Sequence, residues 1–303
     1  MKTFVAITGT TSVGKSSVAV ELAKLLNTEI ISADSMQIYV GMDIGTAKIT
    51  PAEMSGVKHH MIDIVEPNCN YSSFLYQRDA SQIIDKMQSL PIVVGGTGFY
   101  IDSILYPPEF GNVGEERRAK LTQIFQDEGL APLQELLKTL DPETYATIDV
   151  QNSKRLIRAI EIAESGQNRA RGKGKTKPQY RMKLFVLQRN REELYKQIER
   201  RVDKMVEDGL IDEVQRLVNK YGICDTTAFS AIGYKEIIDY IQGKTSLSEA
   251  VEKIKLNTRH YAKRQITYYK KMDVYEYIDV DGKTSSEIAN YIYECITNDE
   301  DFN

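Results

Sequence analysis

Gly9-Thr10-Thr11-Ser12-Val13-Gly14-Lys15-Ser16 is the stretch that decides the predicted fold. It fits the pattern G-x-x-x-x-G-K-[ST], with a hydrophobic run before it at 3–8 and an amphipathic pattern after it at 17–26. Because a strand, a glycine loop and a helix follow one another, the N–H groups of the loop converge at a helix N-terminus, where an anion is stabilised. We predict that these eight residues bind phosphate groups, with Lys15 at the terminal phosphate oxygens and the Ser16 hydroxyl in a Mg²⁺ shell.

Composition limits the class of protein. The chain has 303 residues, 42% hydrophobic and 27% charged, which is typical of a soluble globular protein with a large insertion or two domains. No apolar run approaches the ~20 residues needed to cross a bilayer, so we expect a cytoplasmic protein with no membrane partner. The net charge of −4 argues against a protein that coats nucleic acid over its whole surface, but it allows a local basic patch.

Cys69, Cys224 and Cys295 are three isolated thiols without C-x-x-C spacing. They match neither a disulfide framework nor a zinc finger, and they indicate a reducing compartment.

Asp34 follows a second predicted strand at 29–34. In parallel α/β sheets the ligand crevice lies beyond the carboxyl ends of the strands, so Asp34 should face the phosphate loop. Beside an anion site a carboxylate is usually a general base or holds a metal ion through a bound water molecule, although a helix N-cap is an alternative. In the polar loop that follows, Gln37 could bond both N6 and N7 of an adenine edge.

Two further hydrophobic runs predict strands. A short one covers 61–65, and another at 90–94 leads into Gly95-Gly96-Thr97-Gly98. This second glycine turn also falls at the carboxyl end of a strand, which would bring the Thr97 hydroxyl across the crevice from Lys15. An ordinary turn with an exposed threonine is the alternative.

Helical periodicity dominates residues 113–178, at 117–128, 131–140 and 153–164. We predict an α/β fold, a P-loop NTPase-like parallel sheet with flanking helices, in a core domain of residues 1–112 and 179–303. We expect residues 113–178 to form a mostly helical insertion domain. Five cations at 168–178 lie among glycines, and the sequence leaves open whether this segment is a solvated linker or contacts a phosphate backbone.

A predicted helix at 246–272 is basic and aromatic in its second half. Residues 255–271 contain six Lys or Arg, including Lys263 and Arg264, with three tyrosines and no acid. This combination is typical of RNA contact, and packing through the tyrosines is the alternative.

Several blocks together resemble the bacterial tRNA dimethylallyltransferase family, also called tRNA isopentenyltransferases. They occur in family order over nearly the whole chain: residues 9–16, 34–37, 41–48, 59–63, 95–98, 155–161, 231–236 and 262–265. The resemblance implies transfer of a dimethylallyl group from dimethylallyl diphosphate to N6 of the adenosine immediately 3′ of the anticodon in tRNA, with Mg²⁺ and release of diphosphate.

The resemblance also implies roles for residues. Asp34 would be the base at N6, while Thr97 and Arg201 would act with the glycine loop on the diphosphate. The predicted contacts with the tRNA anticodon loop are Asp34, Ser35, Met36, Gln37, Thr97, Arg118, Lys154, Arg155, Leu156, Ile157, Arg158, Lys263 and Arg264. Lys154 departs from the family, which usually has glutamine there.

Two other functions compete with this one. An ATP-dependent small-molecule or nucleotide kinase would use the same loop. A nucleotide-gated RNA-binding switch is less favoured, because the sequence has no Asn-Lys-x-Asp segment to read guanine. For the transferase we expect a monomer.

Overall fold

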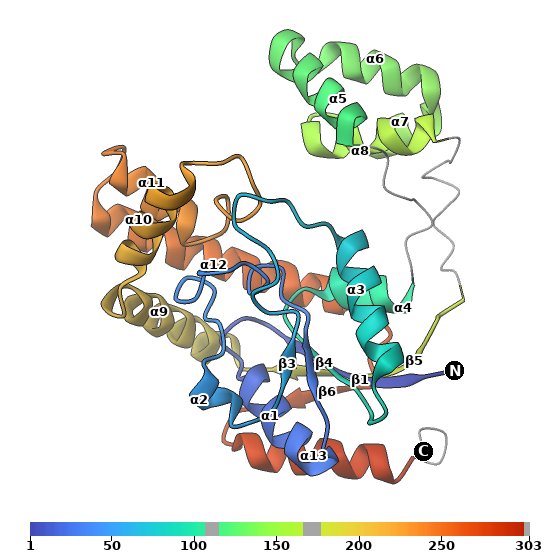
Figure 1. Ribbon diagram of the computed structural model, residues 1–303, viewed down its shortest axis with the longest axis vertical. Coiled ribbons are helices and arrows are strands. Elements are labelled where there is room, and N and C mark those ends of the chain that lie inside the picture. The colour runs from blue at the N-terminus through green and yellow to red at the C-terminus, as the bar shows by residue number, and fades with distance from the viewer. Residues whose placement is uncertain (107–114, 166–176, 300–303) are drawn as a thin grey trace. The chain divides into compact units, whose positions relative to one another are not determined.

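The computed structural model describes residues 1–106, 115–165 and 177–299 (Figure 1). The chain divides into two compact units, the first formed by residues 1–105 and 179–303 and the second by residues 106–178. The predicted insertion, 113–178, falls within the second unit. Most of the basic 168–178 segment lies outside the described residues.

A parallel sheet of six strands forms the centre of the first unit. Its order is β3-β2-β4-β1-β5-β6, and every pairing is parallel. The strands are β1 (Thr3–Gly9), β2 (Ile30–Ser32), β3 (His59–His60), β4 (Ile92–Val94), β5 (Arg181–Gln188) and β6 (Glu276–Asp279). Because both faces of the sheet are covered at its centre, β1 contains a continuous apolar run, and Phe4, Val5, Ala6 and Ile7 are all 0% exposed.

Helices cover both faces of this sheet (Figure 1). On one face α1 (Lys15–Leu26) and α13 (Ser285–Thr297) pack against β1, β4 and β5 in a single apolar cluster. The other face is covered by α3 (Ser73–Lys86), α4 (Gly98–Leu105) and α12 (Leu247–Tyr269). The predicted P-loop NTPase-like α/β fold is confirmed.

A separate apolar cluster packs the loop after β2 against further helices. These are α9 (Arg191–Glu207), α10 (Leu210–Tyr221) and α11 (Tyr234–Ile241), with the N-terminal half of α12. The short helix α2 (Pro51–Met54) ends the same loop. The loop after β2 therefore packs against helices that follow it by more than 150 residues. Both belong to the same unit as the carboxyl end of the sheet.

The second unit is helical where it is described. It contains α5 (Glu115–Glu128), α6 (Ala131–Leu140), α7 (Pro142–Thr147) and α8 (Ser153–Glu164), which bury a common core that includes Leu121, Leu137 and Leu156. The predicted helices at 117–128, 131–140 and 153–164 are present.

The predicted strand at 61–65 is wrong. Residues 59–60 form β3 instead, and Met61 and Asp63 adopt positive φ angles of 63° and 53°. Those left-handed conformations interrupt the extended backbone that a strand requires, so the chain turns away from the sheet after His60.

Candidate active site

One cavity of about 460 Å³ lies beyond the carboxyl ends of the strands of the first unit. Its wall combines the glycine loop, the segment after β2, the turn after β4, and side chains from α9 and α12. Predicted site residues that line it are Thr11, Ser12, Gly14, Lys15, Ser16, Asp34, Ser35, Met36, Gln37, Arg201 and Arg264. Val13 faces the core instead, where it is 2% exposed.

The glycine loop has the backbone geometry of an anion site. Gly14 caps α1 with a φ of 92°, a conformation that disfavours residues with a side chain, and Ser12 has a φ of 63°. Among the described residues, the Thr10 and Ser12 hydroxyls are buried and have no hydrogen-bond partner. Because native proteins rarely leave buried hydroxyls unpaired, these two groups indicate a ligand that completes the loop.

Lys15 is the cation inside this loop. Its Nζ donates to the Thr10 carbonyl at 2.7 Å. Burial lowers the pKa of Lys15 to about 7; the Asp34 carboxylate opposes this change, and the Arg201 guanidinium adds to it. The negative charge near the Lys15 ammonium is therefore too small to offset its burial, so a bound anion would stabilise the charged form.

Arg201 extends from α9 toward the same loop. Its Nη1 donates to the Thr11 hydroxyl at 3.3 Å. Burial lowers the pKa of Arg201, and Asp34 partly opposes that change. Two cations from distant parts of the sequence thus lie at the glycine loop, as a doubly charged phosphate ligand requires.

Asp34 lies beside both cations, two residues after β2. One carboxylate oxygen, Oδ1, accepts the Met36 N–H at 2.9 Å, which fixes the side chain in a local turn. Within the described segments no hydrogen bond occupies Oδ2. The carboxylate lines the cavity with one oxygen available to accept a proton.

Thr97 does not line the cavity. Its Oγ1 accepts the Ser35 N–H at 3.2 Å and lies 3.3 Å from the Ser35 hydroxyl, to which it donates. Thr97 thereby supports the segment that follows Asp34, while its direct contact with diphosphate stays a prediction.

Gln265 and Tyr269 of α12 connect the two glycine loops, and neither was among the predicted site residues. Gln265 accepts the Thr11 N–H at 3.0 Å and donates to the Gly96 carbonyl at 2.9 Å. The Tyr269 hydroxyl lies 2.9 Å from the carbonyl oxygens of both Gly9 and Gly96. Gln265 is 5% exposed in the folded chain, and no local pattern in the sequence shows this burial, because its partners lie 254 and 169 positions away.

The predicted bidentate contact of Gln37 with an adenine edge is at odds with its hydrogen bonds. The Gln37 amide nitrogen donates to the Ala47 carbonyl at 3.2 Å and approaches the Thr46 carbonyl at 3.5 Å. These two carbonyls use the donors of the side-chain amide, so only its oxygen, Oε1, is left as an acceptor.

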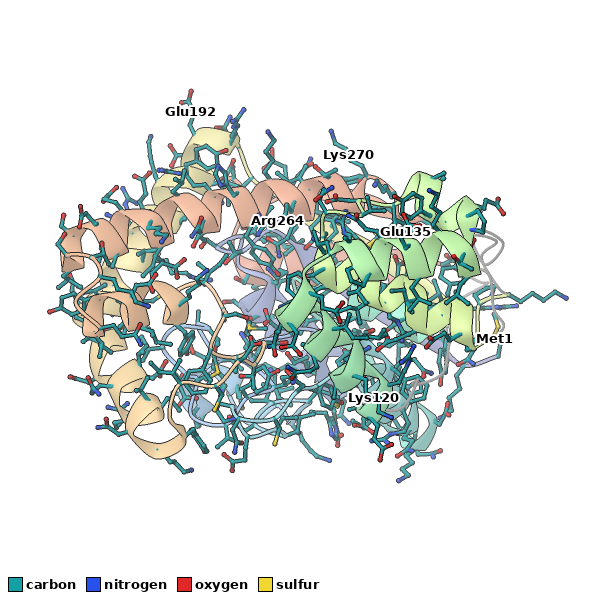
Figure 2. All side chains as sticks on the ribbon, turned by 90° about the horizontal axis from the view of Figure 1, so that it is seen from above. Met1, Lys120, Glu135, Glu192, Arg264 and Lys270 are labelled. Atoms are coloured by element: carbon teal, nitrogen blue, oxygen red, sulfur yellow. The ribbon has the colours of Figure 1, made fainter. Side chains whose placement is uncertain are left out.

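Two of the basic side chains of α12 are paired with acids, which the sequence of this helix did not show. Lys255 pairs with Asp203 at 2.7 Å, and Arg259 pairs with Glu199 of α9 at 2.5 Å. Lys263 and Arg264 stay exposed, and Figure 2 labels Arg264 on this helix and Lys270 directly after its end.

In the second unit the predicted tRNA contacts divide into exposed and buried side chains. Lys154 and Arg155 are exposed at the start of α8, whereas Leu156 is 0% and Ile157 is 7% exposed in the helical core. The last two side chains therefore pack inside this unit and present little surface to RNA.

Arg118 and Arg158 share one buried carboxylate. Arg118 Nε donates to Glu161 at 2.7 Å and Arg158 Nη1 donates to it at 3.0 Å, while the Glu161 side chain is fully buried. Burial alone would raise the pKa of Glu161, but the two arginines hold it below the usual value. The three residues together carry one net positive charge, with both guanidinium groups held in place.

Two negative findings apply to the described residues. No group of three or more His, Cys, Asp or Glu side chains in them could hold a metal ion. None of the helices described there is long and apolar enough to cross a membrane.

Sequence comparisons identify the family. A family described as IPP transferase matches residues 37–272, and one described as isopentenyl transferase matches residues 2–67. A tRNA dimethylallyltransferase from Caldanaerobacter subterraneus subsp. tengcongensis is 45% identical, with 96% of each chain covered. The chain belongs to the tRNA dimethylallyltransferase family. A second family member, from Carboxydothermus hydrogenoformans, is 44% identical, with 93% of each chain covered.

Solved structures of tRNA dimethylallyltransferases share the fold. The tRNA isopentenylpyrophosphate transferase of Bacillus halodurans has a TM-score of 0.73 and 40% identity, covering 97% of this chain and 96% of its own. A eukaryotic dimethylallyltransferase acting on tRNA has a TM-score of 0.84 and 27% identity, covering 98% of this chain and 80% of its own.

Proposed function

We propose that this tRNA dimethylallyltransferase family member transfers a dimethylallyl group from dimethylallyl diphosphate to N6 of the adenosine immediately 3′ of the anticodon in tRNA, releasing diphosphate. The observation that carries the proposal is the placement of Asp34, a carboxylate, in one cavity with the two cations Lys15 and Arg201. A site with this charge arrangement can hold diphosphate at one point and remove a proton at another.

The reaction needs both halves of this site. The lone pair of an exocyclic amine is delocalised into the purine ring, so N6 is a poor nucleophile until a base removes its proton as the new bond forms. Asp34 would take that proton on Oδ2. The bond between the allylic carbon and the diphosphate oxygen breaks, and its electron pair leaves on the diphosphate, which Lys15, Arg201 and the loop N–H groups stabilise.

Mg²⁺ fits the residues that would hold it. Ser16 is exposed at the start of α1 and lines the cavity, so its hydroxyl can join diphosphate oxygens in the shell of the ion. This donor set needs no cluster of carboxylates. When bound, Mg²⁺ would supply further positive charge to the leaving group.

A flipped nucleotide is the second substrate that the cavity requires. An adenine inside a helical stack cannot reach Asp34, and unstacking costs a few kcal/mol, which is lowest for a base in a loop. The anticodon loop provides such a base.

The test is group transfer without a nucleoside triphosphate. The full-length protein is incubated with Mg²⁺, isotope-labelled dimethylallyl diphosphate and unmodified tRNA, and the nucleosides are analysed by mass spectrometry. We expect label on the adenosine 3′ of the anticodon with the wild-type protein and with Lys24→Ala, an exposed lysine of α1 that pairs with Glu21. We expect little label with Lys15→Ala.

The kinase alternative gives the opposite result. If phosphoryl groups move from γ-labelled ATP to an acceptor and no label from dimethylallyl diphosphate enters the RNA, the proposed function is wrong.

A further inference from the structure

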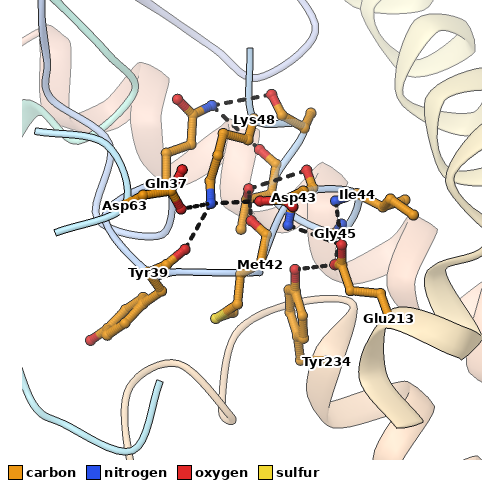
Figure 3. A network of polar contacts seen from close by, with 12 residues as sticks. Gln37, Tyr39, Met42, Asp43, Ile44, Gly45, Lys48, Asp63, Glu213 and Tyr234 are labelled. Carbon is orange, nitrogen blue, oxygen red and sulfur yellow. Dashed lines mark hydrogen bonds and ion pairs between the residues drawn. The ribbon is translucent and has the colours of Figure 1, made fainter. Parts of the chain in front are cut away.

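Glu213 is a buried carboxylate outside the cavity, 2% exposed, that no step of the proposed reaction uses. It lies on α10 and accepts three consecutive backbone N–H groups, from Asp43 at 3.0 Å, Ile44 at 2.8 Å and Gly45 at 3.1 Å (Figure 3). The hydroxyl of Tyr234, on α11, donates to the same carboxylate at 2.6 Å. We call this arrangement, Glu213 and Tyr234 on the N–H groups of 43–45, the Glu213 clamp.

The Tyr234 ring also packs directly against the backbone of Gly45. Tyr234 is 1% exposed, and a Cβ atom added to Gly45 would lie 2.5 Å from the ring. Burial and the neighbouring Glu213 carboxylate raise the pKa of Tyr234 well above its usual value, so the hydroxyl stays a donor. The turn at 43–45 is therefore fixed by hydrogen bonds and by direct packing of its glycine against an aromatic ring.

From the clamp, a chain of hydrogen bonds reaches the cavity wall. Lys48 N–H donates to the Asp43 carbonyl at 2.9 Å, and Lys48 Nζ bonds the Asp43 carboxylate at 2.7 Å. The Thr46 hydroxyl donates to the Met42 carbonyl at 2.6 Å, which closes the turn. The Ala47 carbonyl then accepts the Gln37 amide at 3.2 Å (Figure 3).

This series of hydrogen bonds determines which atom of the Gln37 side chain is available to a ligand. With its nitrogen held by the turn, the Gln37 side chain offers Oε1 as an acceptor on a wall that also carries Asp34. An exocyclic amino group has two hydrogens. Asp34 removes one of them in the proposed reaction, and Gln37 Oε1 accepts the other.

We propose that Glu213 and Tyr234 are positioning residues for the nucleoside substrate. They act through the turn at 43–47, which sets the orientation of the Gln37 side chain. In this orientation Gln37 accepts a hydrogen bond from the substrate base, so a base with an amino group next to Asp34 is selected. The inference rests on the proposed function and adds to it the selection of the nucleoside half of the reaction. Dimethylallyl diphosphate, which binds at the glycine loop, does not depend on the clamp.

The kinetic test separates the two substrates. Tyr234→Phe removes only the hydroxyl, and Glu213→Gln keeps the shape of the side chain but loses its charge. We expect kcat/KM for tRNA to fall about fivefold in Tyr234→Phe and at least tenfold in Glu213→Gln, while the KM for dimethylallyl diphosphate stays within about twofold. A rise in the KM for dimethylallyl diphosphate equal to the loss for tRNA would overturn the proposal, because a general loosening of the fold affects both substrates.

Tyr221→Phe is the matched control. Tyr221 lies on α10, the helix of Glu213, and its hydroxyl donates to Glu66, away from the clamp. Its removal should leave both KM values and kcat within about twofold of the wild type. A tRNA defect as large as that of Tyr234→Phe would overturn the proposal, because loss of any tyrosine hydroxyl bonded to a carboxylate around α10 would then have this effect.

Hydrogen exchange tests the clamp without any activity. In Glu213→Gln and Tyr234→Phe we expect faster amide exchange at residues 43–48 and unchanged exchange at the glycine loop, residues 9–16. Unchanged exchange at 43–48 in both variants would refute the clamp. If the wild-type protein transfers no dimethylallyl group, the proposed function fails independently, and exchange with equilibrium binding of unmodified tRNA still decides the positioning role.

Discussion

Binding of diphosphate should be accompanied by proton uptake at Lys15. In the free protein burial lowers the pKa of this lysine to about 7. A bound diphosphate supplies negative charge beside the ammonium and therefore raises the pKa of Lys15 back toward the ordinary lysine value of 10.5. Because the pKa is higher in the bound state, binding takes up a proton between these two values, and this group's contribution to affinity weakens as the pH rises above 7.

The size of the effect follows from the two pKa values. At pH 8 about one tenth of the free Lys15 side chains are charged, so binding takes up about 0.9 proton; at pH 6 it takes up about 0.1. Calorimetric titration with inorganic pyrophosphate in two buffers of different ionisation enthalpy measures this uptake. Pyrophosphate also titrates in this range, so the wild type is compared with Lys15→Arg, whose guanidinium stays charged.

A control variant and a direct measurement of the pKa of Lys15 test this prediction. Lys24→Ala removes an exposed lysine of the same helix, paired with Glu21, and should retain the wild-type uptake. The ¹³C NMR signal of dimethylated Lys15, assigned with Lys15→Arg, reports its pKa in the absence of ligand. A Lys15 signal that titrates near 10.5, or equal proton uptake in the wild type and Lys15→Arg, would refute the electrostatic argument.

Three further predictions concern the base, the RNA surface and the fold. Asp34→Ala should lower single-turnover transfer by about 10²–10⁴-fold while tRNA affinity changes by no more than a few-fold, and unchanged transfer would remove Asp34 from the role of base. Lys263→Ala or Arg264→Ala should weaken tRNA binding and reduce the salt slope by about one, whereas an unaltered slope in filter binding would make α12 a packing helix only. Gly95→Ala would place a Cβ atom 2.1 Å from the Ala33 carbonyl oxygen, so urea unfolding should show a loss of about 3 kcal/mol or more. A loss below about 0.5 kcal/mol would contradict the close approach of the backbone after β4 to the backbone after β2.

Local signals were sufficient for the parts of the site that are contiguous in the sequence. The glycine loop has a fixed spacing and a strand on one side, and Asp34 follows an apolar run, so both positions could be predicted from short-range pattern. The helices of the second unit were predictable for the same reason, since α6 and α8 have a strong apolar periodicity.

Features that depend on distant partners could not be predicted. The Gln37 amide appeared free in the sequence, yet the carbonyls of Thr46 and Ala47 use its donors. The charges of Lys255 and Arg259 are paired with acids of α9, which no window along α12 contains. Glu213 looked like one acid among many on a charged helix, and only the folded chain shows that it accepts backbone groups about 170 residues away.

The hydrogen bond between Thr11 and Gln265 joins residues 254 positions apart. The glycine loop is translated long before the helix that fixes it, because α12 follows the loop by more than 200 residues. A nascent chain therefore cannot complete this site until α12 has also been translated and has packed against the loop.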